Sequence, residues 1–378
     1  MKKLLLLSAG ALLSFSAMAQ AEAPTLTKAW EYKTVAELPS GADARYGTAG
    51  DGVIYTADKA AKKIISWTKD GKSDYVASDN ITNTAITIDD AGNIIGTRGW
   101  AGGNNSLNFY IVAADTKAIT TFDVTLPEGV EKGILFSMGR AVGNVLSTEG
   151  GYIYYAPNGQ TKVVCVKLVN GQQASAYAST DTGVTFNSTQ VQPALSSEDL
   201  ASETNPANNC YFCTRAKYNQ GGAIRYFNET EWVGFKEPET RYSTDGFDVV
   251  TLKDVNFGVY PTGTAYNTPF AVVDLSDGSI VAETTETVDE SNGSSYYQTI
   301  IAEKVSDTKA NIYQYFAGKR VAMYTFEIPA DYATAIESVA VDANAPVEYY
   351  NLQGVKVANP ENGLFIKKQG NKATKVIL

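Results

Sequence analysis

Histidine is absent from this chain of 378 residues. The absence excludes Ser-His-Asp and Cys-His catalysis and the usual zinc sites, because each of them uses an imidazole. Any acid–base chemistry would therefore fall to Asp, Glu, Tyr or Lys side chains whose pKa values are shifted by their surroundings.

Cysteine is scarce, and the three thiols of Cys165, Cys210 and Cys213 are too few for a disulfide scaffold. Cys210 and Cys213 form a C-x-x-C motif, but the segment has the composition of a strand. Residues three apart in a strand point to opposite faces and lie about 10 Å apart, whereas a disulfide needs α-carbons within about 7 Å. We predict buried, unpaired thiols, with a bond from Cys165 to one of the pair as the alternative. We predict no metal site and no cofactor.

Long apolar runs are missing after the amino terminus. Lys2-Lys3, the apolar stretch Leu4 to Phe15 and the small residues Ala17-Met18-Ala19 have the order of a secretory signal peptide. The stretch is too short to span a bilayer as a helix, so no transmembrane segment is predicted. Residues 1–19 are therefore predicted to be a signal peptide, and the mature protein is predicted to be secreted, periplasmic or at the cell surface.

Positive charge is in deficit, with 31 Lys and Arg against 41 Asp and Glu and a formal net charge of −10. Removal of the signal peptide takes away two of the lysines and makes the balance more acidic. Nucleic acids and anionic membranes are bound by clustered basic residues that replace counterions. The sequence therefore excludes nucleic acid as a partner.

Two stretches about a hundred residues apart repeat one strand-and-turn pattern, at offsets of 99, 99 and 100 residues. A fixed offset indicates a repeated supersecondary unit, and short strands repeated around a ring are typical of a β-propeller. The matching segments are Val53–Ala57 and Tyr152–Ala156, Lys63–Trp67 and Lys162–Val166, and Asp70-Gly71 and Asn170-Gly171.

Residues 20–330 are predicted to form one all-β domain, a six-bladed β-propeller, with seven blades as the alternative. Short apolar runs alternate with turn dipeptides such as Asp51-Gly52, and no sustained helical periodicity is present. The last blade has three evident strands, so we expect the strand at 29–33 near the mature amino terminus to complete this blade as its fourth strand and close the ring. The predicted blades begin near Arg45, Ile81, Ile134, Phe186, Tyr242 and Ser295. The polar stretch 194–209 is predicted to be a long loop within the fourth blade.

The composition changes after the ring, and we predict a linker at 331–345 and a small β tail at 346–378. Glu348 to Val355, Asn362 to Ile366 and Lys372 to Val376 carry a pattern that resembles tails on exported proteins of the Bacteroidetes. Those tails are similar to the sorting domains read by type IX secretion. The resemblance implies contact with export machinery through residues 346–378, and it implies nothing about what the ring binds.

The placement of arginine gives the candidate binding site. Of seven arginines, five fall at comparable blade positions, where the first strand begins or the second strand ends. These positions lie at one end of a four-stranded meander, so the guanidinium groups would surround the central channel on one face. They suit bidentate hydrogen bonds to carboxylate or sulfate groups on a sugar, and two nearby aromatic residues suit stacking. The candidate ligand-binding residues are Arg45, Arg98, Trp100, Arg140, Arg215, Tyr218 and Arg241. The alternative is that the arginines pair with acids between blades, or lie over tyrosines, as structural braces.

Three functions from different classes remain open. The first is an exported, non-catalytic binding protein that presents one propeller face to an extracellular glycan or protein. The second is a carbohydrate-active hydrolase or lyase that uses Asp, Glu or Tyr in the central funnel; Asp43, Glu149, Asp245 and Asp248 are candidate carboxylates, and no spacing singles out a pair. The third is a scaffold of the cell envelope without a small ligand.

Overall fold

The computed structural model describes residues 23–32, 38–39, 41–98, 108–131, 138–187, 189–214, 224–235, 246–262, 269–285, 297–332, 346–351, 356–357, 360, 364–369 and 372–377. The predicted signal peptide and most of the predicted linker lie outside these residues. The described part of the chain is all-β, as predicted, and its strands form seven four-stranded antiparallel sheets.

The first three sheets in chain order are simple meanders, in which each strand pairs with the next one along the chain. Their strands are β2 (Gly47–Gly50), β3 (Val53–Asp58), β4 (Lys63–Thr68) and β5 (Gly71–Ala77); β6 (Ile86–Ile88), β7 (Ile94–Thr97), β8 (Asn108–Val112) and β9 (Ile119–Asp123); and β10 (Val142–Gly143), β11 (Gly151–Tyr155), β12 (Val164–Val169) and β13 (Gln172–Ala178).

Two further meanders follow, and the first of them contains the predicted long loop at 194–209. Its strands are β14 (Gln190–Pro193), β15 (Cys210–Cys213), β16 (Arg225–Phe227) and β17 (Trp232–Gly234), followed by β18 (Asp248–Leu252), β19 (Val255–Pro261), β20 (Phe270–Asp274) and β21 (Ser279–Glu283). The loop between β14 and β15 carries two short helical turns, α1 (Ser197–Leu200) and η2 (Pro206–Asn208). These turns were not predicted from the sequence, because segments of four and three residues are too short to show helical periodicity.

The sixth sheet is closed by the amino-terminal strand, as predicted. β1 (Thr25–Tyr32) pairs antiparallel with β24 (Arg320–Glu327), which continues through β23 (Lys309–Phe316) to β22 (Gln298–Ser306). The Arg320 and Glu31 side chains, 1% and 9% exposed, form an ion pair of 2.7 Å between Nε and Oε1. The two ends of the domain are thus joined by backbone hydrogen bonds and by a buried charge pair.

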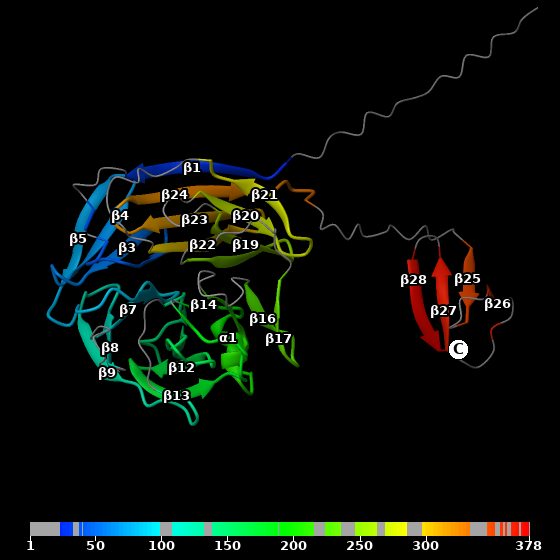
Figure 1. Cartoon of the computed structure of the whole chain (residues 1–378), viewed down its shortest axis with the longest axis horizontal. Coiled ribbons are helices and arrows are strands. Elements are labelled where there is room, and N and C mark those ends of the chain that lie inside the picture. Colours follow the sequence, from blue (N-terminus) through cyan, green and yellow to red (C-terminus); the bar gives the residue numbers. More distant parts are fainter. Residues whose placement is uncertain are drawn as a thin grey trace, which may run out of the picture.

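The six sheets contact one another in a closed cyclic order (Figure 1). Sheet β2–β5 contacts sheet β6–β9 through β2 and β6, and the order continues through β9 with β13 and β11 with β14. The Gln192 Nε2 group of β14 donates to the Phe247 carbonyl beside β18. β18 then contacts β22, and β22 contacts β2, which completes the cycle. This is a β-propeller-like arrangement.

The position of a strand within its sheet determines its burial. The first strands β2 and β6 are almost wholly buried, whereas the fourth strands β5 and β9 are largely exposed. The first strands are therefore innermost. Tight turns join the strands, and Asp51 and Gly52 both adopt positive φ, at 52° and 80°, as the predicted hairpin dipeptide requires.

The repeated pattern found in the sequence occupies equivalent strands. Its first segments form β3 and β11, and its second segments overlap β4 and β12, so the repeat marks the second and third strands of two sheets. All three cysteines are buried and none of them forms a disulfide, as predicted. Cys210 packs in the cluster that contains Val191, and Cys213 packs in the cluster that contains Val249, so the two thiols lie on opposite faces of β15.

The carboxyl-terminal strands β25 (Val347–Tyr350), β26 (Lys356–Val357), β27 (Leu364–Gln369) and β28 (Lys372–Ile377) form a separate sheet. This sheet lies apart from the ring in Figure 1. Among the described residues, no helix has the length and apolar character that a bilayer crossing requires.

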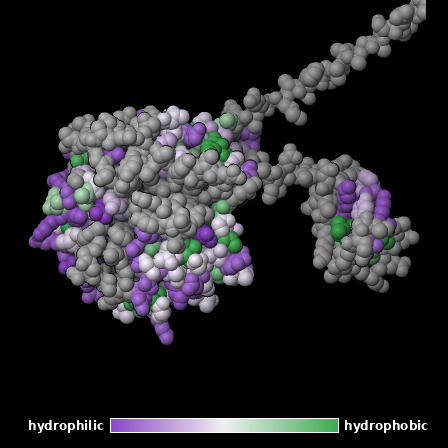
Figure 2. Space-filling view, viewed as in Figure 1, coloured by the Kyte–Doolittle hydropathy of each residue, from purple (hydrophilic) through white to green (hydrophobic). Residues whose placement is uncertain are grey.

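On the face shown in Figure 2, the coloured part of the surface is mainly hydrophilic, with small, scattered apolar spots. The large hydrophobic side chains exposed among the described residues are Ile280, Val305 and Val347. They come from three different strands, β21, β22 and β25.

Candidate functional site

A cavity of about 290 Å³ lies where the innermost strands of four consecutive sheets meet. We call it the axial cavity. Its lining residues are Ala49, Gly50, Asp51, Ile88, Asp89, Asp90, Gly92, Arg140, Ala141, Glu303 and Lys304. Asp51 and Asp90 follow the first strands β2 and β6, so the cavity opens on the face that carries the turns between first and second strands. We call this the turn face.

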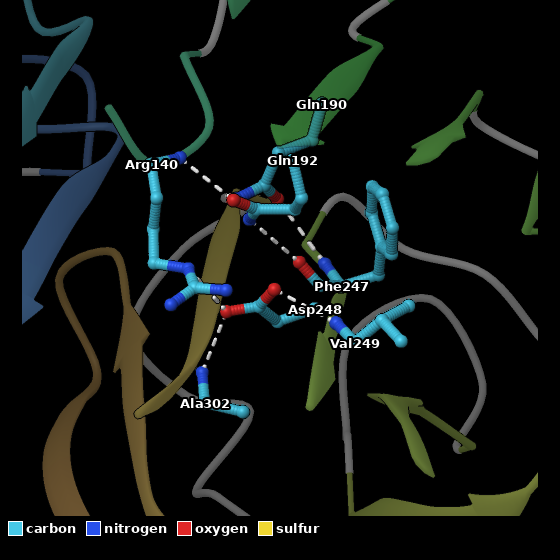
Figure 3. A network of polar contacts seen from close by, with 7 residues as sticks. All are labelled: Arg140, Gln190, Gln192, Phe247, Asp248, Val249 and Ala302. Carbon is cyan, nitrogen blue, oxygen red and sulfur yellow. Dashed lines mark hydrogen bonds and ion pairs between the residues drawn. The ribbon is translucent and has the colours of Figure 1, made fainter. Parts of the chain in front are cut away.

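Arg140 connects the cavity to the two remaining sheets, because it contacts residues of β14 and β18 (Figure 3). Its backbone N–H donates to Oε1 of Gln192 on β14, at 2.7 Å. Its side chain, 29% exposed, reaches toward β18 and places Nε 3.2 Å from Oδ2 of Asp248. Residues of all six sheets therefore either line the cavity or hold Arg140 in place.

Asp248 is the buried partner in this arrangement, and its side chain has no solvent exposure. Oδ1 accepts from the Val249 N–H at 2.7 Å, and Oδ2 accepts from the Ala302 N–H of β22 at 2.8 Å. Burial raises the pKa of Asp248 to about 6, against the opposing effects of Arg140 and the two backbone donors. The carboxylate thus joins β18 to β22 and to Arg140 without reaching solvent.

Neighbouring glutamines complete the polar centre of the ring. Gln192 Nε2 donates to the Phe247 carbonyl at 3.1 Å, and the Phe247 N–H donates to Oε1 of Gln190 at 3.1 Å. Figure 3 shows both side chains extending from β14 toward the strand that begins at Asp248. Gly139 allows this approach, because a Cβ atom there would lie 1.3 Å from the Val191 carbonyl oxygen.

The carboxylates of the axial cavity differ in how far they are engaged by the fold. Asp89 is buried and accepts four hydrogen bonds, from the N–H groups of Ala91, Asn93 and Val145 and from the Asn93 amide. Burial raises its pKa, and these bonds oppose the shift.

Glu303 is also engaged: it accepts from the Asp51 N–H through Oε1 and from the Tyr313 hydroxyl through Oε2. Asp51 and Asp90 are exposed, although Oδ2 of Asp90 accepts from the Gly143 N–H. Asp51 and Asp90 are therefore the carboxylates best placed to meet a ligand from solvent.

The charged side chains of the cavity can form hydrogen bonds with a ligand, both as acceptors and as donors. Four carboxylates supply acceptors, and Arg140 and Lys304 supply donors. None of the described lining residues is aromatic, so recognition by these residues would depend on polar groups and not on stacking. Among the residues that the structure describes, no group of three or more His, Cys, Asp or Glu side chains is arranged to hold a metal ion.

The structure describes three of the seven predicted ligand-binding residues. Arg140 lines the axial cavity. Arg45 precedes β2 and Arg98 follows β7, so both lie at the end of the ring opposite the turn face. The Arg45 guanidinium lies over the Tyr297 ring, 4.5 Å from its centroid, and Arg98 is partly buried. Trp100, Arg215, Tyr218 and Arg241 lie outside the described residues.

Arg45 and Arg140 both adopt the bracing contacts that the sequence left open as an alternative. One lies over a tyrosine, and the other pairs with an acid of another sheet. Arg140 also lines the axial cavity, so it combines a structural contact with a position where a ligand can meet it.

Of the four carboxylates named for an enzyme, Asp248 is buried and fully engaged, as described above. Glu149 is exposed in the turn between β10 and β11, where Thr148 donates to it. Asp43 precedes β2 at the end opposite the turn face, and Asp245 lies outside the described residues.

Sequence reasoning missed Asp51, Asp89, Asp90 and Glu303 as cavity residues. Asp51-Gly52 was interpreted only as a hairpin turn, which it is, and nothing local distinguishes an axial turn from any other. The available signal was that acidic residues occur where the first strands of two successive sheets end, at Asp51 and at Asp89-Asp90.

No protein-family model and no curated protein matches the chain. Among solved structures, a DUF4623 family protein from Bacteroides eggerthii aligns with a TM-score of 0.51 at 10% identity, over 82% of this chain and 77% of that one. A gluconolactonase from Xanthomonas campestris aligns with a TM-score of 0.44 at 10% identity, over 82% and 96% of the two chains. A streptogramin B lyase aligns with a TM-score of 0.40 at 12% identity, over 93% and 97%. At these identities the likeness concerns the fold alone.

Proposed function

We propose that this chain is an exported, non-catalytic binding protein built on a six-bladed β-propeller, and that its axial cavity holds a hydroxyl-rich unit of an extracellular glycan. The six four-stranded sheets in closed cyclic order support the blade count. Export rests on the predicted signal peptide at residues 1–19 and on the sorting-like tail at 346–378.

The observation that carries the proposal is the composition of the axial cavity. Its lining combines carboxylate acceptors with the donors of Arg140 and Lys304 around a small, open, polar space, and sugar hydroxyl groups are both donors and acceptors. Its volume of about 290 Å³ lies near the lower limit for ligand pockets. A single sugar unit at a chain end or branch is therefore a more suitable occupant than a long chain segment.

The carboxylates of the cavity also support a second candidate, a hydrolase or lyase. Asp51 and Asp90 are exposed to a bound ligand. Asp89 and Glu303 already accept structural hydrogen bonds, and Asp248 does not reach solvent, which limits the acids available for proton transfer. This distribution supports binding over catalysis, and product analysis distinguishes the two.

The test is a thermal-shift screen against neutral and anionic polysaccharides, followed by product analysis of every compound that stabilises the protein. Binding is expected without release of shorter products. A Gly50→Gln variant should abolish binding, because a Cβ at Gly50 meets its nearest atoms at 3.7 Å and a longer side chain would extend into the cavity. The matched control is Arg98→Gln on the opposite face, which should bind normally.

Loss of binding in Arg98→Gln with retention in Gly50→Gln would place the site on the opposite face and contradict the proposal. Shortened products that disappear in an Asp90→Asn variant would establish the enzyme instead.

A further inference from the structure

The charged groups of the axial cavity do not balance. Among the lining residues that the structure describes, Asp51, Asp89, Asp90 and Glu303 supply four carboxylates, and Arg140 and Lys304 supply two cations. Lys304 is exposed, so water and salt screen its charge. A ligand that enters the cavity therefore meets a surplus of negative charge.

The positive charge of Arg140 is also compensated by a carboxylate that lies outside the cavity lining. Asp248 lies outside the lining and has no solvent exposure, and its Oδ2 is 3.2 Å from the Arg140 Nε atom. A buried pair is screened much less than an exposed one, so Asp248 cancels most of the attraction that Arg140 would exert on an anion. Figure 3 shows the carboxylate on the side of the guanidinium that faces β18 and β22.

The pairing leaves the hydrogen-bonding capacity of Arg140 largely unused. The ion pair is made through Nε, and among the described residues neither Nη group has a hydrogen-bond partner. Because the side chain lines the cavity, these N–H groups remain available as directional donors. Their positive charge is largely compensated by the Asp248 carboxylate. Such donors suit hydroxyl oxygens, and the exposed carboxylates of Asp51 and Asp90 suit hydroxyl hydrogens.

We infer that the axial cavity accepts neutral or cationic sugar units and rejects anionic ones, and that Asp248 is the specificity-determining residue because it compensates the charge of Arg140. The inference rests on the proposed function and adds the charge class of the ligand. It departs from the sequence-based expectation of an anionic glycan, which considered the arginines without their partners.

The probes are three sugars with the same ring and different charges: glucose, glucosamine and glucuronate. Their dissociation constants are measured by ligand-observed NMR titration with the intact protein at pH 7.5. Glucose and glucosamine are expected to bind, and glucuronate is expected to bind at least about tenfold more weakly than glucose, which corresponds to one unfavourable charge contact.

The decisive variant is Asp248→Asn, which has nearly the same shape and removes the compensating charge. It should improve glucuronate binding about tenfold and change glucose binding little, because hydroxyl recognition does not depend on net charge. An Arg140→Gln change added to Asp248→Asn should abolish this gain. A purely structural role for Asp248 would weaken all three sugars equally.

Exposed variants keep the test independent of the buried pair. Asp51→Asn and Asp90→Asn should each fold and each reduce the preference for glucose over glucuronate a few-fold, because each removes one repulsive charge. Asp70→Asn is the matched control, since it makes the same change on an exposed turn between β4 and β5 outside the cavity lining. It should leave the preference unchanged.

Three results would overturn the inference. Glucuronate could bind the wild-type protein as tightly as glucose, the preference could persist in Asp248→Asn, Asp51→Asn and Asp90→Asn alike, or none of the three sugars could bind. The proposed function has its own criterion. It fails if the polysaccharide screen gives no binding, or gives only binding that persists in Gly50→Gln.

Discussion

Single residues at the centre of the ring perform two tasks at once. Asp248 accepts hydrogen bonds from two backbone N–H groups and pairs with Arg140, so one buried carboxylate joins three sheets. A buried pair of this kind is costly to desolvate, and its main consequence is sensitivity to the loss of either partner. The same pair leaves the Nη groups of Arg140 available in the axial cavity.

The raised pKa of Asp248 predicts a pH dependence of stability. The unfolded carboxyl has its usual pKa of 3.8 and the folded one has a pKa of about 6. The folded state therefore holds a proton that the unfolded state releases, and the associated stability is present below pH 3.8 and lost as pH rises through 6. The difference amounts to about 3 kcal/mol.

The free energies of unfolding of the wild-type protein and Asp248→Asn, measured in urea at intervals from pH 3 to pH 7.5, isolate this contribution. Their difference should decrease by about 3 kcal/mol as the pH rises, because the variant cannot titrate. Parallel curves for the two proteins would contradict the assignment.

A side chain at position 139 should also destabilise the centre of the ring. A Gly139→Ala change would place Cβ 1.3 Å from the Val191 carbonyl oxygen, so the backbones of two sheets must separate. We expect a loss of about 3 kcal/mol or more in the free energy of unfolding. Gly50→Ala, with its nearest atoms at 3.7 Å, is the matched control and should change the value by less than about 1 kcal/mol. Equal effects of the two changes would show that the sheets are not in close contact at the centre.

At the scale of elements, strand order followed from the sequence because its signals are local. The repeat identified β3, β4, β11 and β12, and the dipeptide Asp51-Gly52 identified a turn with positive φ. The axial cavity was not predictable in the same way, because it forms where turns of different sheets meet. The pairing of Arg140 with Asp248 likewise joins strands that are distant in sequence, and no residue near either one indicates its partner.

Removal of the strand β1 should be the most damaging truncation of the ring. Removal of residues 23–32 would expose the edge of β24 and leave Arg320, 1% exposed, without Glu31. An exposed edge promotes aggregation and loss of a buried ion pair is destabilising, so we expect loss of soluble monomer in size-exclusion chromatography. A chain that begins at Ala23 is the control and should elute as a monomer. A soluble monomer without β1 would contradict this account of closure.

At the scale of the whole molecule, the ring and the carboxyl-terminal sheet should behave as separate units. β25 to β28 pair among themselves and lie apart from the ring in Figure 1. Truncation after Tyr332 should therefore leave the main calorimetric transition of the ring within about 1 °C of its position in the full chain, a shift that reflects only a small fraction of a kcal/mol. A large decrease would show that the tail stabilises the ring.

Cyclic closure was predictable for a different reason from the site. A missing fourth strand at one terminus and an unpartnered strand at the other are visible in the sequence, whereas the face that carries a cavity depends on how side chains fill the centre. The arginine pattern directed attention to the face of Arg45 and Arg98. The described cavity lies at the other end of the ring. Arg140 belongs both to the arginine pattern and to the cavity lining.

The most direct measurement is a crystal structure of the protein with a neutral oligosaccharide from the thermal-shift screen. A terminal sugar unit should lie in the axial cavity, within hydrogen-bond distance of the Arg140 Nη groups and of Asp51 or Asp90. A sugar bound instead at the opposite end of the ring, beside Arg45 and Arg98, with the axial cavity empty, would contradict it.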